Sequence, residues 1–216
     1  MVLAEAQPKT WHGIYAGSYD LGAYLAHLAR HTRFIGSVLA DQPKRLLEVG
    51  TGSGTMSVFL SSLGYDVTSI DNDEAVLSVA GKTSEAFRGD VRFELADAFD
   101  LPYGDGDFDV AFSQGLMEHF SDEEIARMME EQLRVARTAV FSVPNNFYGQ
   151  KDVGNERLLT KERWERVVSQ FRVVESEDYY YGRLRRHLYR RRPQMYLCKL
   201  ASESPARTGG RNGGSP

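Results

Sequence analysis

Length, composition and charge together indicate a globular protein of one domain, or of one domain with short appendages. The chain has 216 residues, of which 42% are hydrophobic and 26% are charged, so neither a disordered chain nor a coiled coil fits. The 26 Lys and Arg residues against 30 Asp and Glu residues give a formal charge of −4, which argues against general coating of nucleic acid. A local patch that contacts nucleic acid stays open.

The single cysteine and the absence of long apolar runs in the sequence bear on the compartment. Cys198 lies in an apolar run and cannot form an internal disulfide, which fits a reducing environment and a role in core packing. The sequence lacks the ~18 or more consecutive apolar residues that span a bilayer. Residues 1–10 also lack a basic segment followed by an apolar one. We therefore expect a cytoplasmic protein without a membrane partner.

The first predicted elements are helices, followed by a strand–helix–strand unit. Over residues 19–39 apolar residues recur at intervals of three and four, which predicts one or two amphipathic helices. Residues 45–49 are a short apolar run closed by Gly50, which is typical of a buried strand. A helix over 55–63 and a strand over 65–70 then complete one β-α-β unit.

The alternation of strands and helices continues along the chain. Ser121 and Glu124 form a capping-box pattern, and an apolar stripe of Ile125, Met128, Met129, Leu133 and Ala136 follows it. Alternation at this spacing predicts an α/β doubly wound, Rossmann-like fold, with a mostly parallel sheet and helices on both faces. The expected elements are helix 73–87, strands 91–95 and 108–113, helix 122–136 and strand 139–143.

The last third of the chain changes character. A loop over 145–159 and a helix over 160–171 precede two strands, 172–181 and 194–200, which resemble a closing hairpin. Residues 201–216 contain 4 Gly, 3 Ser and 2 Pro and almost nothing apolar, which predicts a disordered tail. We therefore divide the chain into N-terminal helices (1–44), an α/β domain (45–200) and a tail (201–216).

A glycine-rich turn follows the first strand and predicts a cofactor site. Gly50, Gly52 and Gly54 let the backbone approach a ligand closely at the start of a helix. A dinucleotide fingerprint would need its third glycine at position 55, which is Thr55, and no Gly-Lys-Ser/Thr of a P-loop follows. Asp71 ends the second strand, where a carboxylate can accept hydrogen bonds from ribose hydroxyls. These features favour an adenosine without a pyrophosphate.

From roughly residue 45 to residue 200 the chain resembles the class I S-adenosylmethionine-dependent methyltransferases. The run from Glu48 to Gly54 resembles the family motif E/D-x-G-x-G-x-G, and Asp71 resembles its ribose-binding acid. Asp97-Ala98 resembles the adenine-edge pair, and residues 107–115 resemble the fourth-strand motif that faces the methionine moiety. The resemblance implies seven strands, the last one antiparallel, and transfer of a methyl group from S-adenosyl-L-methionine that leaves S-adenosylhomocysteine.

The resemblance implies a set of cofactor-binding residues, and four of them have structural alternatives. The aromatic residues before the core stand where the family often carries a lid, or they pack a helix onto the sheet. Glu48 contacts the ligand or only holds the glycine loop, and Asp97 contacts adenine or only forms a turn. The set is Tyr15, Tyr19, Glu48, Gly50, Thr51, Gly52, Asp71, Asn72, Asp97, Ala98 and Gln114.

His119 is the candidate general base, because it follows the fourth strand and histidine titrates near neutrality. The alternative is that His119 only hydrogen-bonds its loop, and His12 and His187 are weaker candidates. The sequence at Ser113 to Leu116 differs from the Asn-Pro-Pro-Tyr motif of amino-group DNA methyltransferases. Gln114 stands where a metal-dependent catechol-type site would carry an acid, so we expect no metal.

Substrate contacts are expected from the 145–159 loop, with Tyr148 as a candidate, and from an arginine-rich hairpin. Six arginines stand between Arg183 and Arg192, and without them the formal charge is −4 − 6 = −10. Guanidinium groups suit phosphate or carboxylate, so Arg185 and Arg186 are candidates for an anionic substrate. A solvated connection, or an interface in a homodimer, is the alternative.

The expected function is therefore methyl transfer from S-adenosyl-L-methionine to a small, perhaps anionic, metabolite. An RNA or protein methyltransferase that uses the arginine-rich hairpin is the first alternative. A partner subunit that binds the cofactor without turnover is the second. The residues leave the acceptor atom undefined.

Overall fold

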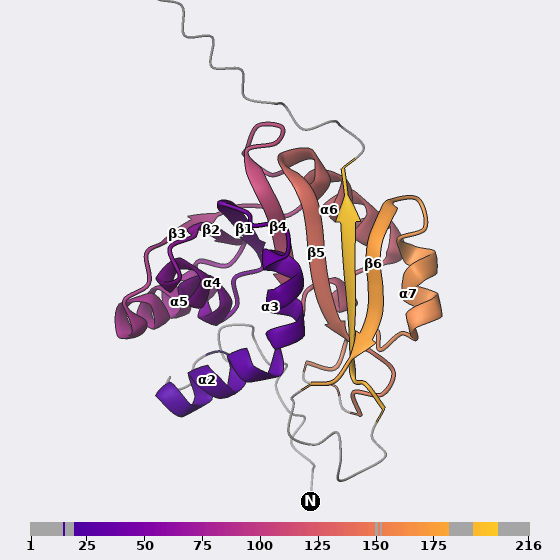
Figure 1. The fold of residues 1–216 in the computed structure, drawn as a ribbon, viewed down its shortest axis with the longest axis horizontal. Coiled ribbons are helices and arrows are strands. Elements are labelled where there is room, and N and C mark those ends of the chain that lie inside the picture. The colour runs from indigo at the N-terminus through magenta and orange to yellow at the C-terminus, as the bar shows by residue number, and fades with distance from the viewer. Residues whose placement is uncertain (1–14, 16–19, 150, 152, 182–191, 203–216) are drawn as a thin grey trace, which may run out of the picture.

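The structure is a computed structural model that describes residues 15, 20–149, 151, 153–181 and 192–202. The described residues form a seven-stranded sheet in the order β3-β2-β1-β4-β5-β7-β6 (Figure 1). The strands are β1 (Arg45–Val49), β2 (Asp66–Asp71), β3 (Val91–Leu95), β4 (Phe108–Gln114), β5 (Ala136–Pro144), β6 (Arg172–Tyr179) and β7 (Met195–Ala201).

Strands β1 to β5 are parallel, whereas β7 runs antiparallel to both β5 and β6. The predicted doubly wound fold with an antiparallel last strand is therefore confirmed. The chain goes outward in one direction from β1 to β3, and then crosses back to place β4 on the other side of β1. At such a switch point the loops after two adjacent strands diverge, and ligands bind at the carboxyl ends of the strands there.

Helices cover both faces of the sheet. The helices of the first half are α2 (Leu21–Arg30), α3 (Thr32–Leu39), α4 (Thr55–Ser62) and α5 (Glu74–Phe87). The short 3-10 helix η1 (Met117–His119) follows β4, and α6 (Asp122–Val135) and α7 (Lys161–Val167) complete the set. In α6 the predicted capping box is present, because the side chains of Ser121 and Glu124 each bind the other's backbone N–H.

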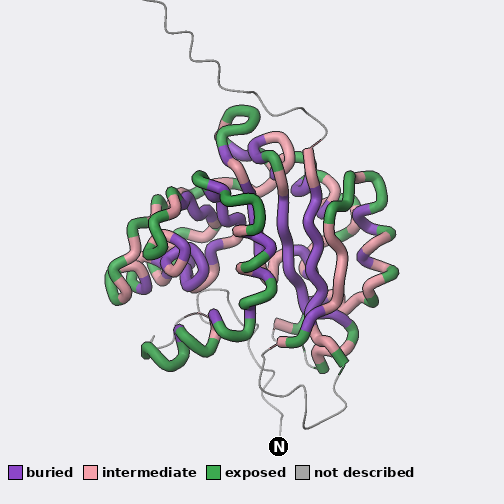
Figure 2. The backbone as a smooth tube through the Cα atoms, in the orientation of Figure 1, coloured by how far each residue is buried: buried purple, intermediate pink, exposed green. Residues whose placement is uncertain are grey.

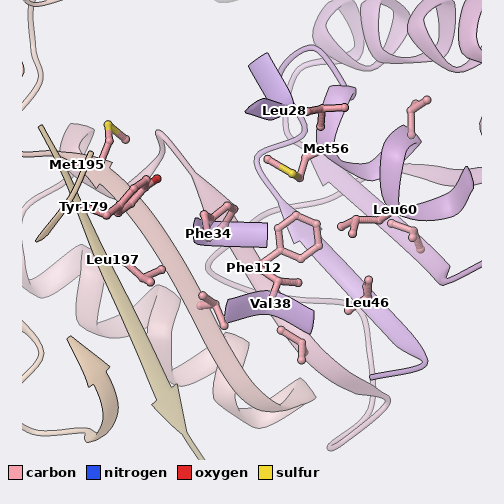
Figure 3. Close-up of a cluster of buried hydrophobic side chains, with 14 of the residues drawn as sticks. Leu28, Phe34, Val38, Leu46, Met56, Leu60, Phe112, Tyr179, Met195 and Leu197 are labelled. Atoms are coloured by element: carbon pink, nitrogen blue, oxygen red, sulfur yellow. The ribbon is translucent and has the colours of Figure 1, made fainter. Parts of the chain in front are cut away.

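The core has one half on each face of the sheet. Figure 3 shows the half beneath α3 and α4, where the ring of Phe34 meets the edge of Phe112 on β4 with centroids 6.2 Å apart. On the other face, Trp164 of α7 stacks on Tyr196 of β7, with centroids 6.0 Å apart. Cys198 is fully buried there, as its apolar run predicts. The central strands are consequently buried along most of their length (Figure 2).

Several predicted boundaries and faces need correction. Strand β5 begins at Ala136, directly after α6, without the expected connection. Helix α7 ends at Val167, before the predicted end at residue 171. The chain turns over the four residues that follow, although apolar residues continue to recur there at helical spacing. In α6 the polar Gln132 is buried, whereas Leu133, which was predicted to belong to the buried stripe, is only partly buried.

Helix α2 buries less than its apolar pattern predicts. Only Tyr24 and Leu28 are buried, whereas Leu21 and Leu25 are 60% and 53% exposed. The ring of Tyr24 stacks on Phe87 at the end of α5, with centroids 4.1 Å apart. The helix therefore contacts the body of the protein along one narrow stripe. None of the described helices is long and apolar enough to cross a membrane.

Candidate functional site

A cavity lies at the carboxyl ends of β1, β2, β3 and β4, where the switch point predicts a ligand site. Its lining combines the glycine loop, the ends of β2 and β3, the β4–α6 connection and two residues from the N-terminal segment. The lining residues include Tyr15, His27, Glu48, Gly50, Thr51, Gly52, Ser53, Met56, Asp71, Asn72, Asp97, Ala98, Phe99, Gln114, Gly115, Leu116, His119 and Phe120.

The glycine loop needs glycine for two separate reasons. Gly50, Gly52 and Gly54 all have positive φ (81°, 51° and 72°), which side chains rarely adopt. A Cβ on Gly54 would also lie 2.8 Å from the Cβ of Ala80, so α4 and α5 can approach only with glycine there. The loop therefore presents bare backbone to the cavity at the start of α4, which suits close approach of a ligand.

Glu48 is buried beneath this loop and holds it in place. Its carboxylate accepts hydrogen bonds from Ser57 and from Ser69, the latter at 3.0 Å, and Ser69 in turn bonds the hydroxyl of Thr51. Burial raises the pKa of Glu48 to about 7, although the hydrogen bonds from the serines oppose that shift. The hydrogen bonds by which Glu48 would hold the glycine loop are therefore present. The residue also lines the cavity.

Asp71 ends β2 on the far side of the glycine loop. Its Oδ1 accepts the backbone N–H of Asp73 at 3.2 Å, and hydrogen bonds from the N–H groups of Gly52 and Asn72 also hold the carboxylate. Burial nevertheless raises the pKa of Asp71, because it is the largest of the competing influences. The carboxylate is thus fixed in the cavity lining at the place expected for an acid that binds a ribose.

Asp97 and Ala98 follow β3 and also line the cavity. The Oδ1 atom of Asp97 accepts the N–H of Phe99 at 2.9 Å, so Asp97 does form a turn, as the structural alternative predicts. A carboxylate bound on one oxygen keeps acceptor capacity on the other. Both interpretations of Asp97 are therefore compatible with its position.

Gln114 ends β4, and His119 ends η1 directly after it; both line the cavity. The Nδ1 atom of His119 lies 2.7 Å from Oδ1 of Asn155, in the loop between β5 and α7. Its Nε2 atom lies 3.8 Å from a carboxylate oxygen of the buried Glu118. Because Asn155 Oδ1 can only accept, Nδ1 of His119 is the donor in this contact.

The loop that carries Asn155 is fixed to the β4–α6 connection by a second set of contacts. The backbone N–H of Arg157 donates to the carbonyl of Glu118 at 2.8 Å. Its guanidinium binds the carbonyl of Phe120 and, together with Arg163, the carboxylate of Asp122. The position of His119 therefore depends on residues about forty positions away in the chain.

Two lining residues come from the N-terminal segment. Tyr15 lies over the glycine loop, because a Cβ on Gly52 would be 3.1 Å from Cζ of its ring. His27 of α2 is a functional candidate that sequence reasoning missed, since its helix pattern gives no sign that the polar face turns to a cavity. Burial, with a contribution from Arg30, lowers the pKa of His27 to about 4.

The remaining predicted site residues lie outside the cavity lining or outside the described part of the chain. Tyr148 is outside the lining and packs against Tyr181, with ring centroids 6.0 Å apart, so substrate contact by Tyr148 stays a prediction. Tyr19, Arg185 and Arg186, together with the weaker candidates His12 and His187, lie outside the described residues. Among the residues that the structure describes, no group of three or more His, Cys, Asp or Glu could hold a metal ion.

The geometry defines a doubly wound α/β protein with a nucleoside-type cofactor site at its switch point. Comparison with known proteins narrows that class. Residues 46–139 match a family model described as a methyltransferase domain. The demethylmenaquinone methyltransferase of Thermus thermophilus is 34% identical over 103 residues, which cover 47% of this chain and 47% of that protein.

Two further matches agree. An O-methyltransferase of Aspergillus nomiae is 31% identical over 122 residues, which cover 52% of this chain and 54% of that protein. The magnesium protoporphyrin IX methyltransferase of Synechocystis with bound SAH has the same fold, with a TM-score of 0.62 and 15% identity over 89% of this chain and 92% of that one. The chain spans about half the length of the curated relatives described.

Residues 46–139 therefore match a methyltransferase domain, and the fold is one that a methyltransferase of solved structure shares. The resemblance drawn from its glycine loop and its three acidic positions is thereby confirmed.

Proposed function

We propose that this protein transfers a methyl group from S-adenosyl-L-methionine to a small molecule and releases S-adenosylhomocysteine. One observation carries the proposal: a single cavity is lined by the glycine loop, by carboxylates at the ends of β2 and β3, and by a histidine after β4. These groups match the parts of the cofactor in the order in which the strands lie in the sheet.

The residues present fit the cofactor. The bare backbone of Gly50 and Gly52 admits the methionine moiety, and Asp71 would accept the two ribose hydroxyls. Asp97 and Ala98 would contact the adenine edge, and Tyr15 would cover the cofactor from the N-terminal side. Glu48, Thr51, Asn72 and Gln114 complete the proposed set.

The chemistry asks the protein mainly for alignment and exclusion of water. When bound, the cofactor supplies an electrophilic methyl carbon: an acceptor lone pair bonds to it while the carbon–sulfur bond breaks and leaves its electron pair on sulfur. Helix α2 supports exclusion of water, because its residue His27 belongs to the cavity lining. His119 would take the proton of an O–H or N–H acceptor on Nε2, since Nδ1 is held by Asn155.

The acceptor is less defined than the cofactor. The matched relatives are named for a quinone and for an O-methyl product, so the family name alone leaves the acceptor open. An anionic metabolite would need the arginines between Arg183 and Arg192, of which the structure describes only Arg192. An RNA or protein methyltransferase depends on the same arginines. A partner subunit without turnover would keep the cavity but use no base.

Mass spectrometry of small molecules released from the purified protein tests the cofactor first. A methyl-transfer assay with labelled S-adenosyl-L-methionine and fractionated lysate then tests turnover. Label in a small-molecule fraction supports the proposal, whereas label in RNA or protein supports the first alternative. Cofactor binding without S-adenosylhomocysteine in any fraction would favour the partner subunit instead.

A further inference from the structure

A surface of stacked aromatic and arginine side chains lies beside the cavity, just beyond the ends of β5 and β6. The guanidinium of Arg30, the last residue of α2, lies over the ring of Tyr181, with Cζ 5.3 Å from the ring centroid. Tyr181 makes an edge-to-face contact with Tyr148, with centroids 6.0 Å apart. Next to Tyr148 in the chain, Phe147 carries the guanidinium of Arg192 over its ring at 4.7 Å. We call these five residues the arginine shelf.

Buried polar contacts join the chain segments that carry most of the shelf. Asn145, directly after β5, is fully buried, and its side-chain N–H groups donate to Asp178 of β6 at 3.0 Å and to the carbonyl of Pro193 at 2.9 Å. Its Oδ1 atom accepts the backbone N–H of Phe147 at 2.9 Å. The ends of β5 and β6 lie at the same end of the sheet as α2 (Figure 1). The rings of the shelf therefore stand on a fixed base to which α2 adds Arg30.

The shelf adjoins the cavity through α2. Arg30 stands three positions after His27, so the two share one face of the helix, and His27 lines the cavity. The ring centroid of His31 lies 4.8 Å from that of His27 and 5.1 Å from that of Tyr181. Burial lowers the pKa of His27 to about 4, and the charge of Arg30 adds to that shift. The positive charge of Arg30 therefore acts on the cavity wall.

Arg30 lacks the countercharge that Arg33, three positions further along the chain, possesses. Arg33 binds the carboxylates of Glu175 and Glu177 on β6. Just beyond that strand, the chain presents the ring of Tyr181 to Arg30 instead. A ring attracts a guanidinium without neutralising it, and the N–H edge of the fork stays open to an oxyanion. In the part of the chain that the structure describes, neither arginine of the shelf forms an ion pair.

The charges that line the cavity itself have the opposite sign. Glu48, Asp71 and Asp97 lie on or after β1, β2 and β3, where we propose that the cofactor binds. Carboxylates there suit a cofactor that carries a sulfonium and an ammonium group. The shelf lies toward β5 and β6, on the other side of the switch point. The site is thus acidic at its cofactor end and basic at the far end, which favours an acceptor with a negative charge.

We infer that the arginine shelf binds an oxyanion group of the acceptor, a carboxylate or a phosphate. This inference rests on the proposed function, and it concerns a part of the acceptor that is remote from the methyl group. Arg30 provides the contact through the parallel N–H groups of its fork, and Arg192 adds to the positive field. Because Arg30 stands on α2, it can be tested separately from the arginines between Arg183 and Arg192.

Three fluorescent probes that differ in charge test the inference without turnover. The protein is saturated with S-adenosylhomocysteine, verified by calorimetry, and titrated with 2-naphthoate, 2-naphthyl phosphate and the neutral 2-naphthamide. We expect at least one anion to bind about tenfold or more tightly than the amide, and the stronger anion identifies the group. Arg30→Gln should weaken that anion about tenfold or more and leave the amide within about twofold, the effect of a lost charge-assisted hydrogen bond.

Matched variants separate the shelf from general charge and from misfolding. Arg172→Gln makes the same charge change at an exposed position at the start of β6, the opposite end of the strand, and should leave anion binding unchanged. Tyr181→Leu removes the ring under Arg30 and should weaken the anion, whereas Tyr181→Phe should keep its affinity within about twofold. All variants should retain the wild-type affinity for S-adenosylhomocysteine, which shows that they fold.

Four results would overturn the inference. Three of them are undetectable binding of both anions, an amide that binds as tightly as both, and a loss in Arg172→Gln as large as that in Arg30→Gln. The fourth is a short single-stranded RNA that displaces the anion with a steep log–log dependence on salt, which would assign the shelf to nucleic acid. A wild-type protein that fails to bind S-adenosylhomocysteine would instead overturn the proposed function.

Discussion

His119 and Asn155 stand 36 residues apart in the chain, and their side chains meet at 2.7 Å between Nδ1 and Oδ1. The contact joins the connection after β4 to the loop between β5 and α7, and the Arg157 contacts reinforce it. Because Oδ1 accepts, the contact holds a proton on Nδ1 of His119. The β5–α7 loop thus contributes to the site through a side chain outside the cavity lining.

We expect His119→Ala to lower kcat by about a hundredfold or more with little change in cofactor affinity, the usual effect of a lost general base. Asn155→Leu should lower kcat less and shift the His119 ring toward the Nε2–H tautomer, which long-range proton–nitrogen correlation by NMR can detect. Asn146→Leu, an exposed position of the same loop, serves as the control. A loss below about fivefold for His119→Ala would return this residue to a loop-holding role.

Asp71→Ala should weaken binding of S-adenosyl-L-methionine and of S-adenosylhomocysteine alike, by about 1–3 kcal/mol, because the ribose hydroxyls lose their acceptor. Asp73→Ala is the matched control, since it keeps the backbone N–H that binds Asp71 and removes the side chain that caps α5 through the N–H of Ala75. Calorimetry on the three proteins measures the difference. Equal losses in both variants would mean that the effect comes from the loop and not from the ribose contact.

The pKa of Glu48 predicts a pH dependence of stability. Its value is about 7 in the folded protein against an ordinary 4.5, so between these pH values the folded state holds a proton that the unfolded state has released. Stability from this group is therefore complete below about pH 4.5 and falls by about 3 kcal/mol as pH rises through 7. Glu48→Gln should remove that part of the slope, measured as the free energy of unfolding in urea.

Comparing Glu48→Gln with the wild type separates the contribution of Glu48 to the pH dependence of stability from that of the buried histidines. Burial lowers the pKa of His27 to about 4 and that of His31 to about 3, so their contribution is present above about pH 6.5 and is lost as pH falls. The slope of stability against pH that the histidines cause has the opposite sign to that of Glu48, and it is the same in the wild type and in Glu48→Gln. Parallel curves for wild type and Glu48→Gln would contradict the assignment.

Reversing Arg185 and Arg186, which lie outside the described residues, to Glu tests the arginine-rich hairpin. If the hairpin contacts an anionic acceptor, the double reversal raises KM steeply and leaves cofactor binding intact. An RNA partner would add a steep log–log dependence of affinity on salt, whereas a small anion gives a shallow one. Unchanged turnover with an altered oligomer in light scattering would make the hairpin an interface.

The parts of the site that sequence could predict are those set by local backbone requirements. Gly50, Gly52 and Gly54 are needed by their own φ angles, and Asp71 is placed by the end of a strand. The mostly parallel sheet followed from the alternation of strands and helices, and the antiparallel last strand followed from the family pattern. Prediction failed where the outcome depends on what a residue meets across the fold.

His27 and Asn155 illustrate that second group. The periodicity of α2 shows which residues are apolar, but whether a polar position faces a cavity depends on how the helix sits on α4 and α5. Asn155 lies in a loop without a motif, and its partner is chosen by the docking of that loop through Arg157. The exposure of Leu21 and Leu25 could not be predicted for the same reason, since apolar spacing alone does not show what covers a helix.

Isothermal titration calorimetry of the wild-type protein with S-adenosyl-L-methionine, S-adenosylhomocysteine, NAD and ATP tests the central claim most directly. The cavity described above predicts saturable one-to-one binding of the first two ligands and no binding of NAD or ATP, because the glycine loop lacks the features that hold a pyrophosphate or a triphosphate. Binding of NAD or ATP, with no heat from either S-adenosyl compound, would contradict it.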